Sequence, residues 1–92
     1  MEQSIAQLSA LADETRLAAM KLLFDGQEHC VCELMRQIGA SQSRMSRHMA
    51  ILKRAGWVTD RRDAQWVRYR LNANLSGASK TLLDAALHLH KA

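Results

Sequence analysis

The sequence predicts a mainly α-helical protein with a small β-hairpin, folded as a single domain over residues 1–92. Three observations predict this class. Apolar residues recur at helical spacing through most of the chain, a glycine follows three of these stretches, and alternation typical of strands begins only after residue 56. A chain of 92 residues with 48% apolar and 24% charged residues has the size and composition of one small globular domain.

The N-terminal part of the chain predicts two helices. The first is expected over residues 3–12, where apolar side chains keep helical spacing. Asp13 suits the N-cap of a second helix, because its carboxylate can accept from a free N–H group of the first turn. The apolar face of this second helix is expected to hold Leu17, Met20, Leu23 and Phe24. Gly26 is expected to end it.

Two further helices are expected on either side of a short turn. The third helix is short, covers residues 31–38 or starts one residue earlier, and ends at Gly39. Ser41 caps a fourth helix that runs to residue 55, and Gly56 stops it. A short helix, a glycine-containing turn and a longer helix together form a helix-turn-helix.

After Gly56 the sequence predicts a hairpin and one last helix. One strand begins at Trp57-Val58-Thr59, and residues 67–71 alternate between apolar and basic side chains in another. The link between the strands lacks Asn-Gly, so the type of turn stays open. A basic hairpin that follows a helix-turn-helix is typical of a wing, so the predicted architecture is a winged helix-turn-helix with five helices.

The last helix is expected to begin at Leu75 and to carry an apolar seam. The seam consists of Leu75, Ala78, Leu82, Ala85 and Leu89, with Leu83, Ala86 and Leu87 beside it. One face of this helix can pack on its own domain and the other on a partner. We therefore predict a homodimer.

Positive charge is concentrated between residues 44 and 70. That segment holds eight basic and two acidic residues, whereas the rest of the chain is mildly acidic. A basic surface on a small domain is typical of a protein that binds a polyanion, although charge alone fits a solvated face equally well. Neither a membrane-spanning run nor a secretory signal is visible, so we expect a cytoplasmic protein without membrane association.

The fourth predicted helix has an outward side that suits the major groove of DNA. Met45, Met49 and Leu52 fall together on its inner side. The outward side chains are short and polar near the N-terminus and basic toward the C-terminus, which permits close approach to base edges. They are Gln42, Ser43, Ser46, Arg47, Lys53 and Arg54. Arg61 and Arg62 are expected at the tip of the wing, against phosphate or a minor groove, or else as solubilising residues.

Four segments resemble the ArsR/SmtB family of winged-helix metal-sensing repressors. They are LADETRLAAMKLL (11–23), CVCEL (30–34), SQSRMSRHMAILKRAGWV (41–58) and RRDAQWVRYRL (61–71). The resemblance implies a homodimeric repressor that binds double-stranded operator DNA and dimerises through its first and last helices. Residues 41–48 match the family's recognition-helix segment, which adds Ser41, Arg44 and His48 to the candidate DNA contacts. His48 lies at the inner edge of the helix, where it could pack in the core or contact phosphate.

Cys30 and Cys32 stand at the start of the third predicted helix. The positive end of a helix favours thiolates, and thiolates bind soft ions, but the pair could also be two small buried apolar side chains. Side chains two residues apart on an ideal helix point about 200° apart. We therefore expect both cysteines to hold one ion only if the first helical turn unwinds or rotates, and we expect that distortion to reach the recognition helix.

The CVCEL segment is similar to the arsenic-sensing branch of the family. This similarity implies a repressor that is released from its operator when arsenite binds Cys30 and Cys32, with no obligatory cofactor. The branch has a third cysteine where this chain has Met35, so Met35, His29 or an external thiol would complete the coordination. Another soft metal or a redox switch at the two cysteines is the alternative signal.

Two other functions have weaker support in the sequence. Asp84 and His88 share a helical face and could bind zinc, with His90 pointing away from His88, although a solvated polar face is the default. A small thiol enzyme is disfavoured, because the sequence contains neither a His/Asp relay nor a glycine-rich phosphate loop. We therefore expect no enzymatic activity.

Overall fold

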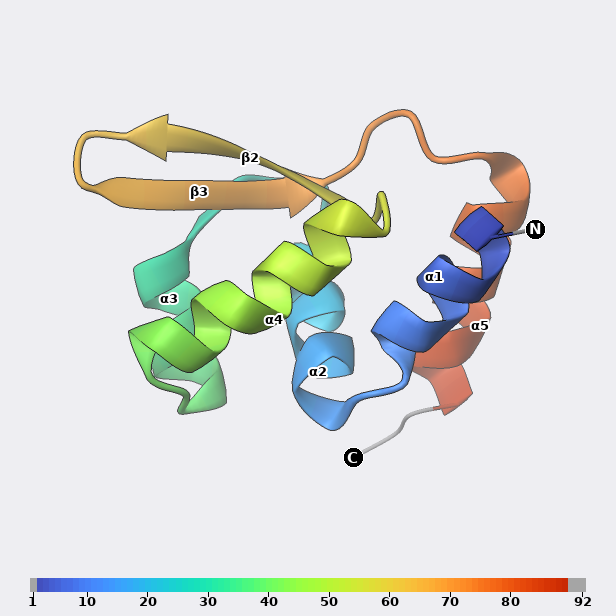
Figure 1. Ribbon diagram of the computed structural model, residues 1–92, viewed down its shortest axis with the longest axis horizontal. Coiled ribbons are helices and arrows are strands. Elements are labelled where there is room, and N and C mark those ends of the chain that lie inside the picture. Colours follow the sequence, from blue (N-terminus) through green and yellow to red (C-terminus); the bar gives the residue numbers. More distant parts are fainter. Residues whose placement is uncertain (1, 90–92) are drawn as a thin grey trace.

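The computed structural model describes residues 2–89, which form five helices and a three-stranded antiparallel sheet (Figure 1). In chain order the elements are α1 (Glu2–Leu11), α2 (Glu14–Leu23), β1 (His29–Cys30), α3 (Val31–Ile38), α4 (Gln42–Arg54), β2 (Val58–Asp63), β3 (Trp66–Leu71) and α5 (Gly77–Leu89). This order confirms the predicted winged helix-turn-helix, in which α3 and α4 are the helix pair and β2 and β3 are the wing.

The predicted helix caps are present. The Asp13 carboxylate accepts from the backbone N–H of Arg16 at 3.0 Å, and the Ser41 hydroxyl accepts from the N–H of Arg44 at 3.3 Å. Gly39 ends α3 with a left-handed φ of 83°, a conformation that costs glycine little. These local interactions set the short turn that aims α4 relative to α3.

The core lies between the helices and the base of the wing. Met45, Met49 and Leu52, on the inner side of α4, are completely buried, as predicted. Trp57 is also fully buried, and its indole N–H donates to the backbone carbonyl of Gln7 at 3.0 Å, which ties the end of the recognition helix to α1. Phe24 was placed wrongly by the sequence: it is 44% exposed, because α2 ends at Leu23 and Phe24 is the residue that follows the last helical turn.

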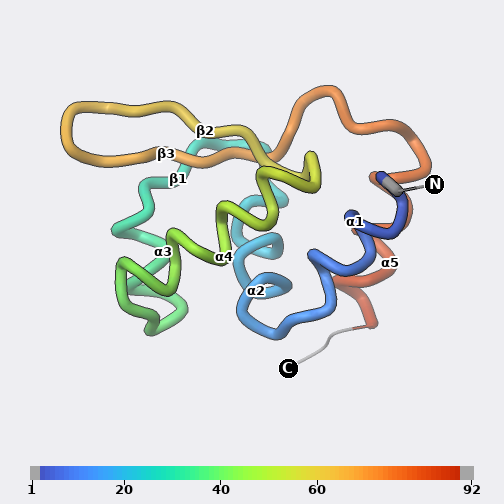
Figure 2. The backbone as a smooth tube through the Cα atoms, in the orientation of Figure 1, coloured from blue at the N-terminus to red at the C-terminus, as the bar shows by residue number. Residues whose placement is uncertain are grey.

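The sheet contains a strand that the sequence pattern did not predict. Strand β1 pairs with β3, in the order β1-β3-β2, and it lies along the β3 side of the wing in Figure 2. In this register His29 is opposite Tyr69 and Cys30 is opposite Arg68. Strands β2 and β3 pair from Val58–Leu71 to Asp63–Trp66, which leaves a two-residue turn. The segment that carries the cysteines is therefore part of the wing sheet.

Helix α5 begins at Gly77, two residues later than predicted, because the Ser76 hydroxyl accepts from the N–H of Ser79 at 3.1 Å and caps it. Leu83 is fully buried against the domain, whereas Leu89 is 88% exposed. The helix therefore has one face on its own core and one open face, next to α1. Within residues 2–89, no helix has the length and apolar character needed to span a membrane.

Candidate functional site

The outward face of α4 is open to solvent along its length. Every predicted contact on this face is exposed: Gln42, Ser43, Arg44, Ser46, Arg47, Lys53 and Arg54. Ser41 is exposed too, but its hydroxyl already serves as the N-cap of the helix. The side chains at the N-terminal end are small, so the helix backbone could approach closely the floor of a groove. The basic side chains lie toward the C-terminal end.

His48 sits at the edge of this face and turns toward α2. Its Nδ1 atom lies 3.1 Å from a guanidinium nitrogen of Arg16 and 3.7 Å from the Asp13 carboxylate. Burial alone would raise the pKa of Asp13, but the Arg16 backbone N–H, the Arg16 charge and His48 outweigh it and lower that pKa below its usual value. His48 is thus half-buried and belongs to a polar cluster between the recognition helix and the start of α2.

The basic side chains in and beside the wing differ in whether they form ion pairs within the protein. Arg61 makes two hydrogen bonds of 2.8 Å to the carboxylate of Glu28, and Lys53 on α4 lies 3.0 Å from Asp60. Within residues 2–89, the side chain of Arg62 has no hydrogen-bond or ion-pair partner. The Arg61 hydrogen bond and charge also lower the pKa of Glu28. In the DNA-free protein, Arg62 is therefore the wing cation that is most readily available to an outside anion.

The expected position of the two wing arginines needs a correction. Both lie within β2, Arg61 opposite Arg68 and Arg62 opposite Val67, and the tip is the Ala64-Gln65 turn. The sequence analysis missed the role of three acidic residues, Glu28, Asp60 and Asp63. Each of them forms an ion pair with a basic side chain across or beside the sheet.

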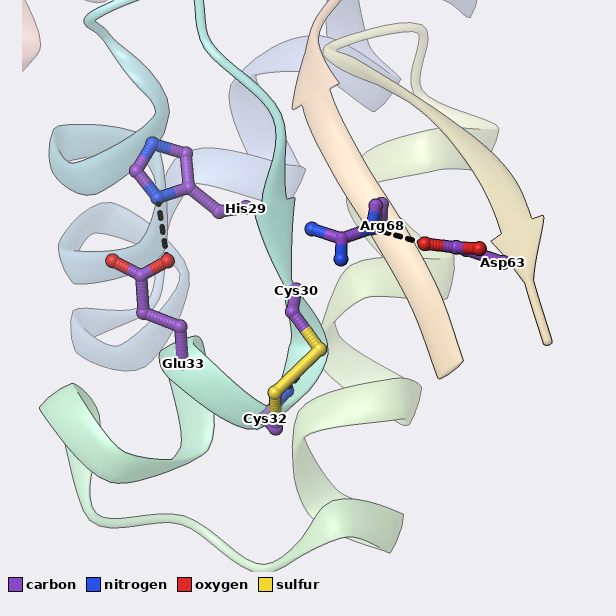
Figure 3. The surroundings of a disulfide bond; sticks show 6 residues. All are labelled: His29, Cys30, Cys32, Glu33, Asp63 and Arg68. Atoms are coloured by element: carbon purple, nitrogen blue, oxygen red, sulfur yellow. Dashed lines mark hydrogen bonds and ion pairs between the residues drawn. A yellow bond between two sulfur atoms is a disulfide. The ribbon is translucent and has the colours of Figure 1, made fainter. Parts of the chain in front are cut away.

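Cys30 and Cys32 are joined as a disulfide (Figure 3). Their Cα atoms are 5.2 Å apart. The structure differs from the ideal helix on which the expected unwinding or rotation was based: Cys30 is the N-cap of α3 in extended conformation, with φ −67° and ψ 143°, and only Cys32 is helical. The extended residue turns its side chain back over the first turn, where its Sγ accepts from the N–H of Cys32 at 3.3 Å.

A basic residue lies across the sheet from Cys30. Arg68 is directly opposite Cys30 in the antiparallel sheet, so the two side chains start on the same face of the sheet. The Arg68 guanidinium also binds Asp63 at 2.8 Å (Figure 3).

The other predicted ligands do not gather around the cysteines. His29 points away from them in Figure 3, and its two ring nitrogens lie 3.0 Å from Asp25 and 3.2 Å from Glu33. Nor does any cluster of three or more Cys, His, Asp or Glu side chains suited to a metal ion occur within residues 2–89. His88 is exposed and its Nδ1 donates to the backbone carbonyl of Asp84 at 2.8 Å, as on a solvated face, while His90 lies outside the described residues.

A winged helix-turn-helix with an open, basic recognition helix defines a DNA-binding transcriptional regulator. A profile described as the bacterial regulatory protein, arsR family, matches residues 13–60, and the chain belongs to that family. Both the fold and the relatives are those of transcriptional regulators and not of enzymes.

Two curated relatives and two solved structures illustrate the match. The chain is 41% identical over 76 residues to the arsenical resistance operon repressor of Escherichia coli K12, which covers 83% of this chain and 65% of the relative. It is 45% identical over 78 residues to the arsenic resistance transcriptional regulator ArsR2 of Pseudomonas putida KT2440, covering 85% and 68%. The chain thus spans about two thirds of the length of these relatives.

The solved structures agree over most of the fold. HlyU from Vibrio cholerae N16961 superposes with a TM-score of 0.80 at 35% identity, covering 97% of this chain and 92% of that one. NolR from Sinorhizobium fredii superposes with a TM-score of 0.77 at 31% identity, covering 97% and 85%. The winged helix-turn-helix is therefore matched as a whole and not only in its helix pair.

The carboxylates around His29 predict a pH-dependent contribution to stability. Burial alone would lower the pKa of His29, but its hydrogen bonds to Asp25 and Glu33 outweigh this and raise that pKa above the ordinary 6.5. The charged ring therefore stabilises the fold fully below about pH 6.5, and this contribution is lost as the pH rises through the raised pKa. We expect the difference in unfolding free energy between the wild type and His29→Gln to be larger at about pH 5.5 than at about pH 8.5.

Denaturant unfolding at both pH values measures this difference. The same substitution at the exposed His88 is the control and should change the unfolding free energy little at either pH. A difference for His29→Gln that is equal at the two pH values, or larger at the higher one, contradicts the prediction.

Proposed function

We propose that this protein is a dimeric repressor that binds operator DNA and is released when arsenite binds Cys30 and Cys32. The observation that carries the proposal is the combination of an open recognition helix with a sulfur pair at the junction between α3 and β1, the strand that pairs with the wing. The names of two relatives, which refer to arsenical and arsenic resistance, support arsenite as the inducer.

In the proposed complex, α4 lies in the major groove. Gln42 and Arg47 reach base edges, while Ser43 and Ser46 bond bases or phosphates. The wing lies along the adjacent backbone, where Arg62 meets phosphate. Arg61 and Lys53 join it by exchanging a carboxylate partner for a phosphate. Such exposed ion pairs are individually weak because water screens them, so the exchange costs little.

A second copy of this chain is the proposed occupant of the open face formed by α1 and α5. This face exposes Ile5 by 60%, Leu8 by 49% and Leu89 by 88%. Beside them lies a mostly apolar hollow of about 320 Å³, lined by residues that include Leu8, Leu82 and Leu89. Pairing two copies there would place two recognition helices on one duplex, so the operator would be an imperfect palindrome.

The proposed inducer site uses the two cysteines as thiolates. Trivalent arsenic favours three sulfur ligands, and this chain supplies two of them once two molecules of a thiol such as glutathione have reduced the Cys30–Cys32 disulfide and formed a disulfide of their own. An external thiol completes the set, because Met35 is a weaker thioether ligand and His29 is held by Asp25 and Glu33. Movement of Cys30 would reach the wing through its pairing with β3 and reach α4 through α3.

A second candidate signal is oxidation, because the structure holds the two cysteines as a disulfide while α3 is helical from Val31 onward. With hydrogen peroxide as the oxidant, the two thiols would form the disulfide while the peroxide is reduced to two molecules of water. The wing and the recognition helix would then sense the change in the pair from dithiol to disulfide.

Substitutions in α4 and the wing should separate base reading from phosphate binding. The probe is a duplex selected by the wild-type protein from a random-sequence library, with a scrambled duplex beside it. We expect Arg47→Ala to weaken binding to the selected duplex by about 1–3 kcal/mol and to relax specificity. Arg62→Ala should weaken both duplexes alike and reduce the slope of log affinity against log salt by about 1.

Lys21→Ala, an exposed cation on α2, is the matched control for loss of charge and should leave both affinities nearly unchanged. Full affinity in both arginine variants would show that this face does not contact DNA.

Arsenite should weaken the binding of the reduced wild-type protein to the selected duplex by about 5- to 150-fold, the range of a typical coupling free energy. Cys30→Ser and Cys32→Ser each remove one thiolate and should bind DNA equally well with and without arsenite. Met35→Leu should keep the wild-type response, because an external thiol and not the thioether completes the site. Fluorescence anisotropy of a labelled duplex measures all four proteins in the presence of glutathione.

If arsenite leaves the wild-type affinity unchanged, arsenite is not the inducer. Parallel titration with hydrogen peroxide then distinguishes the redox signal, whose product is a disulfide that mass spectrometry detects as a loss of two hydrogens.

A charge on the α1–α5 face should prevent dimerisation. We expect Leu8→Asp to sediment as a monomer at concentrations at which the wild type is a dimer, because a carboxylate would be buried in an apolar interface. Phe24→Asp is the matched control, since Phe24 is exposed to a similar extent, 44%, but lies at the end of α2. Equal sedimentation of the wild type and Leu8→Asp would place the interface elsewhere.

A further inference from the structure

A hollow on one edge of the recognition helix collects basic side chains. It has a volume of about 230 Å³ and is lined by Arg44, Arg47, His48 and Ile51. Arg44 and His48 are one helical turn apart, so their side chains share a face. The lining offers only hydrogen-bond donors around an apolar floor, apart from the imidazole, whose role depends on where its proton lies.

The contacts of His48 fix the position of that proton. Its Nδ1 atom lies 3.1 Å from a guanidinium nitrogen of Arg16, and the guanidinium can only donate. Nδ1 must therefore accept, which puts the ring proton on Nε2. The Asp13 carboxylate, at 3.7 Å, is too far away to draw the proton to Nδ1.

The Nε2–H group is available to an outside acceptor. No described residue makes a hydrogen bond to it, and no buried polar side-chain atom lacks a partner within residues 2–89. Nε2 therefore reaches solvent, on a ring whose other nitrogen is held by the protein.

Arg16 is itself firmly positioned. Its Nε donates to the carbonyl of Ala10 at the end of α1 at 2.6 Å, and its backbone N–H donates to Asp13 at 3.0 Å. The guanidinium is thus anchored to the corner between α1 and α2 before it reaches His48 on α4. One side chain connects the proposed dimerisation helix to the recognition helix.

We propose that this hollow binds a phosphate of the DNA backbone between the Arg44 guanidinium and the Nε2–H of a neutral His48, and that Arg16 is the positioning residue that holds His48 in this tautomer. The inference rests on the proposed DNA binding and adds a defined phosphate site to it. A neutral donor adds a hydrogen bond to phosphate without adding charge, so His48 contributes to affinity but not to its salt dependence.

The first test is the tautomer of His48 in the protein without DNA. A long-range ¹H–¹⁵N spectrum of the histidine-labelled protein at pH 8, where an imidazole is neutral, distinguishes the two tautomers. We expect the Nε2–H form in the wild type and in Arg16→Lys, which keeps a donor, and a mixture of tautomers in Arg16→Gln. His48→Gln assigns the signal. A wild-type ring protonated on Nδ1 would overturn the proposal.

The second test uses two substitutions at His48, each of which keeps one of the two hydrogen-bonding positions of the imidazole ring. The amide of Gln reaches the position of Nε2 and can still donate to phosphate, whereas the amide of Asn reaches only the position of Nδ1 and can still accept from Arg16. On the duplex selected by the wild type, we expect His48→Gln to lose less than about threefold in affinity and His48→Asn to lose about tenfold or more. The salt slope should stay unchanged in both, while Arg44→Ala reduces it by about 1.

A scan of the same duplex with single uncharged methylphosphonates identifies the phosphate. One position should weaken the wild type and His48→Gln more than His48→Asn, which has already lost the imidazole contact and keeps only that of Arg44. Equal binding by the Gln and Asn variants, or no such position, would overturn the phosphate site while salt-dependent DNA binding stands. A wild-type protein that binds no duplex in a salt-dependent manner would overturn the proposed function and this inference together.

Discussion

The burial of one edge of α4 is the constraint on which the DNA-facing surface depends. Met45, Met49 and Leu52 are all completely buried. Successive side chains of a helix are about 100° apart, so a roll of the helix by one residue would expose a methionine and bury Ser46 or an arginine. Burying an unpaired arginine is far more costly than any adjustment of the core. The core therefore selects which side chains face outward, and the outward set is small and polar at one end and basic at the other.

Strand β1 joins the sulfur pair to the wing. Two residues form only a minimal strand, but it is supported on both sides: α3 starts directly after it, and Glu28 directly before it binds Arg61 of β2 through two hydrogen bonds. Arg68, between them in β3, is opposite Cys30 and holds Asp63 at the end of β2. The cysteine segment and the wing are thus one structural unit, whose exposed ion pairs are individually weak and can be remade when a phosphate approaches.

The parts of the fold that were predictable from the sequence are those fixed by local chemistry. The helix ends at Asp13, Ser41 and Gly39 could be predicted from these residues themselves. Asp13 and Ser41 accept a hydrogen bond from an N–H group of the first helical turn, and Gly39 adopts the left-handed conformation that ends α3. Strand β1 was not predictable in this way, since two residues carry no alternating pattern and its partner in β3 is distant in the chain. The exposure of Phe24 also depended on the residue at which α2 stops.

The candidate site shows the same division. The exposed face of α4 followed from helical periodicity, but the pairing of Arg61 with Glu28 and of His48 with Arg16 arose from elements that meet only in the folded chain. The relative orientation of the two cysteine side chains depended on the residue at which α3 begins. Whether the helix starts at residue 30 or 31 cannot be decided from the sequence, and this difference determines whether the two sulfurs point apart or meet.

The position of Cys30 also suggests how a small ligand could influence a helix. Its sulfur accepts from the N–H of Cys32 and so serves as the side-chain cap of α3. In the proposed sensor, an ion that takes up the sulfur lone pairs competes with this cap. Loss of an N-cap typically costs about 0.5–2 kcal/mol. This is of the same order as the coupling of about 1–3 kcal/mol that joins two allosteric sites. Because Cys30 precedes α3 in extended conformation and is paired with β3, the binding free energy can act on the first turn of α3 and on the strand pairing that aligns the wing.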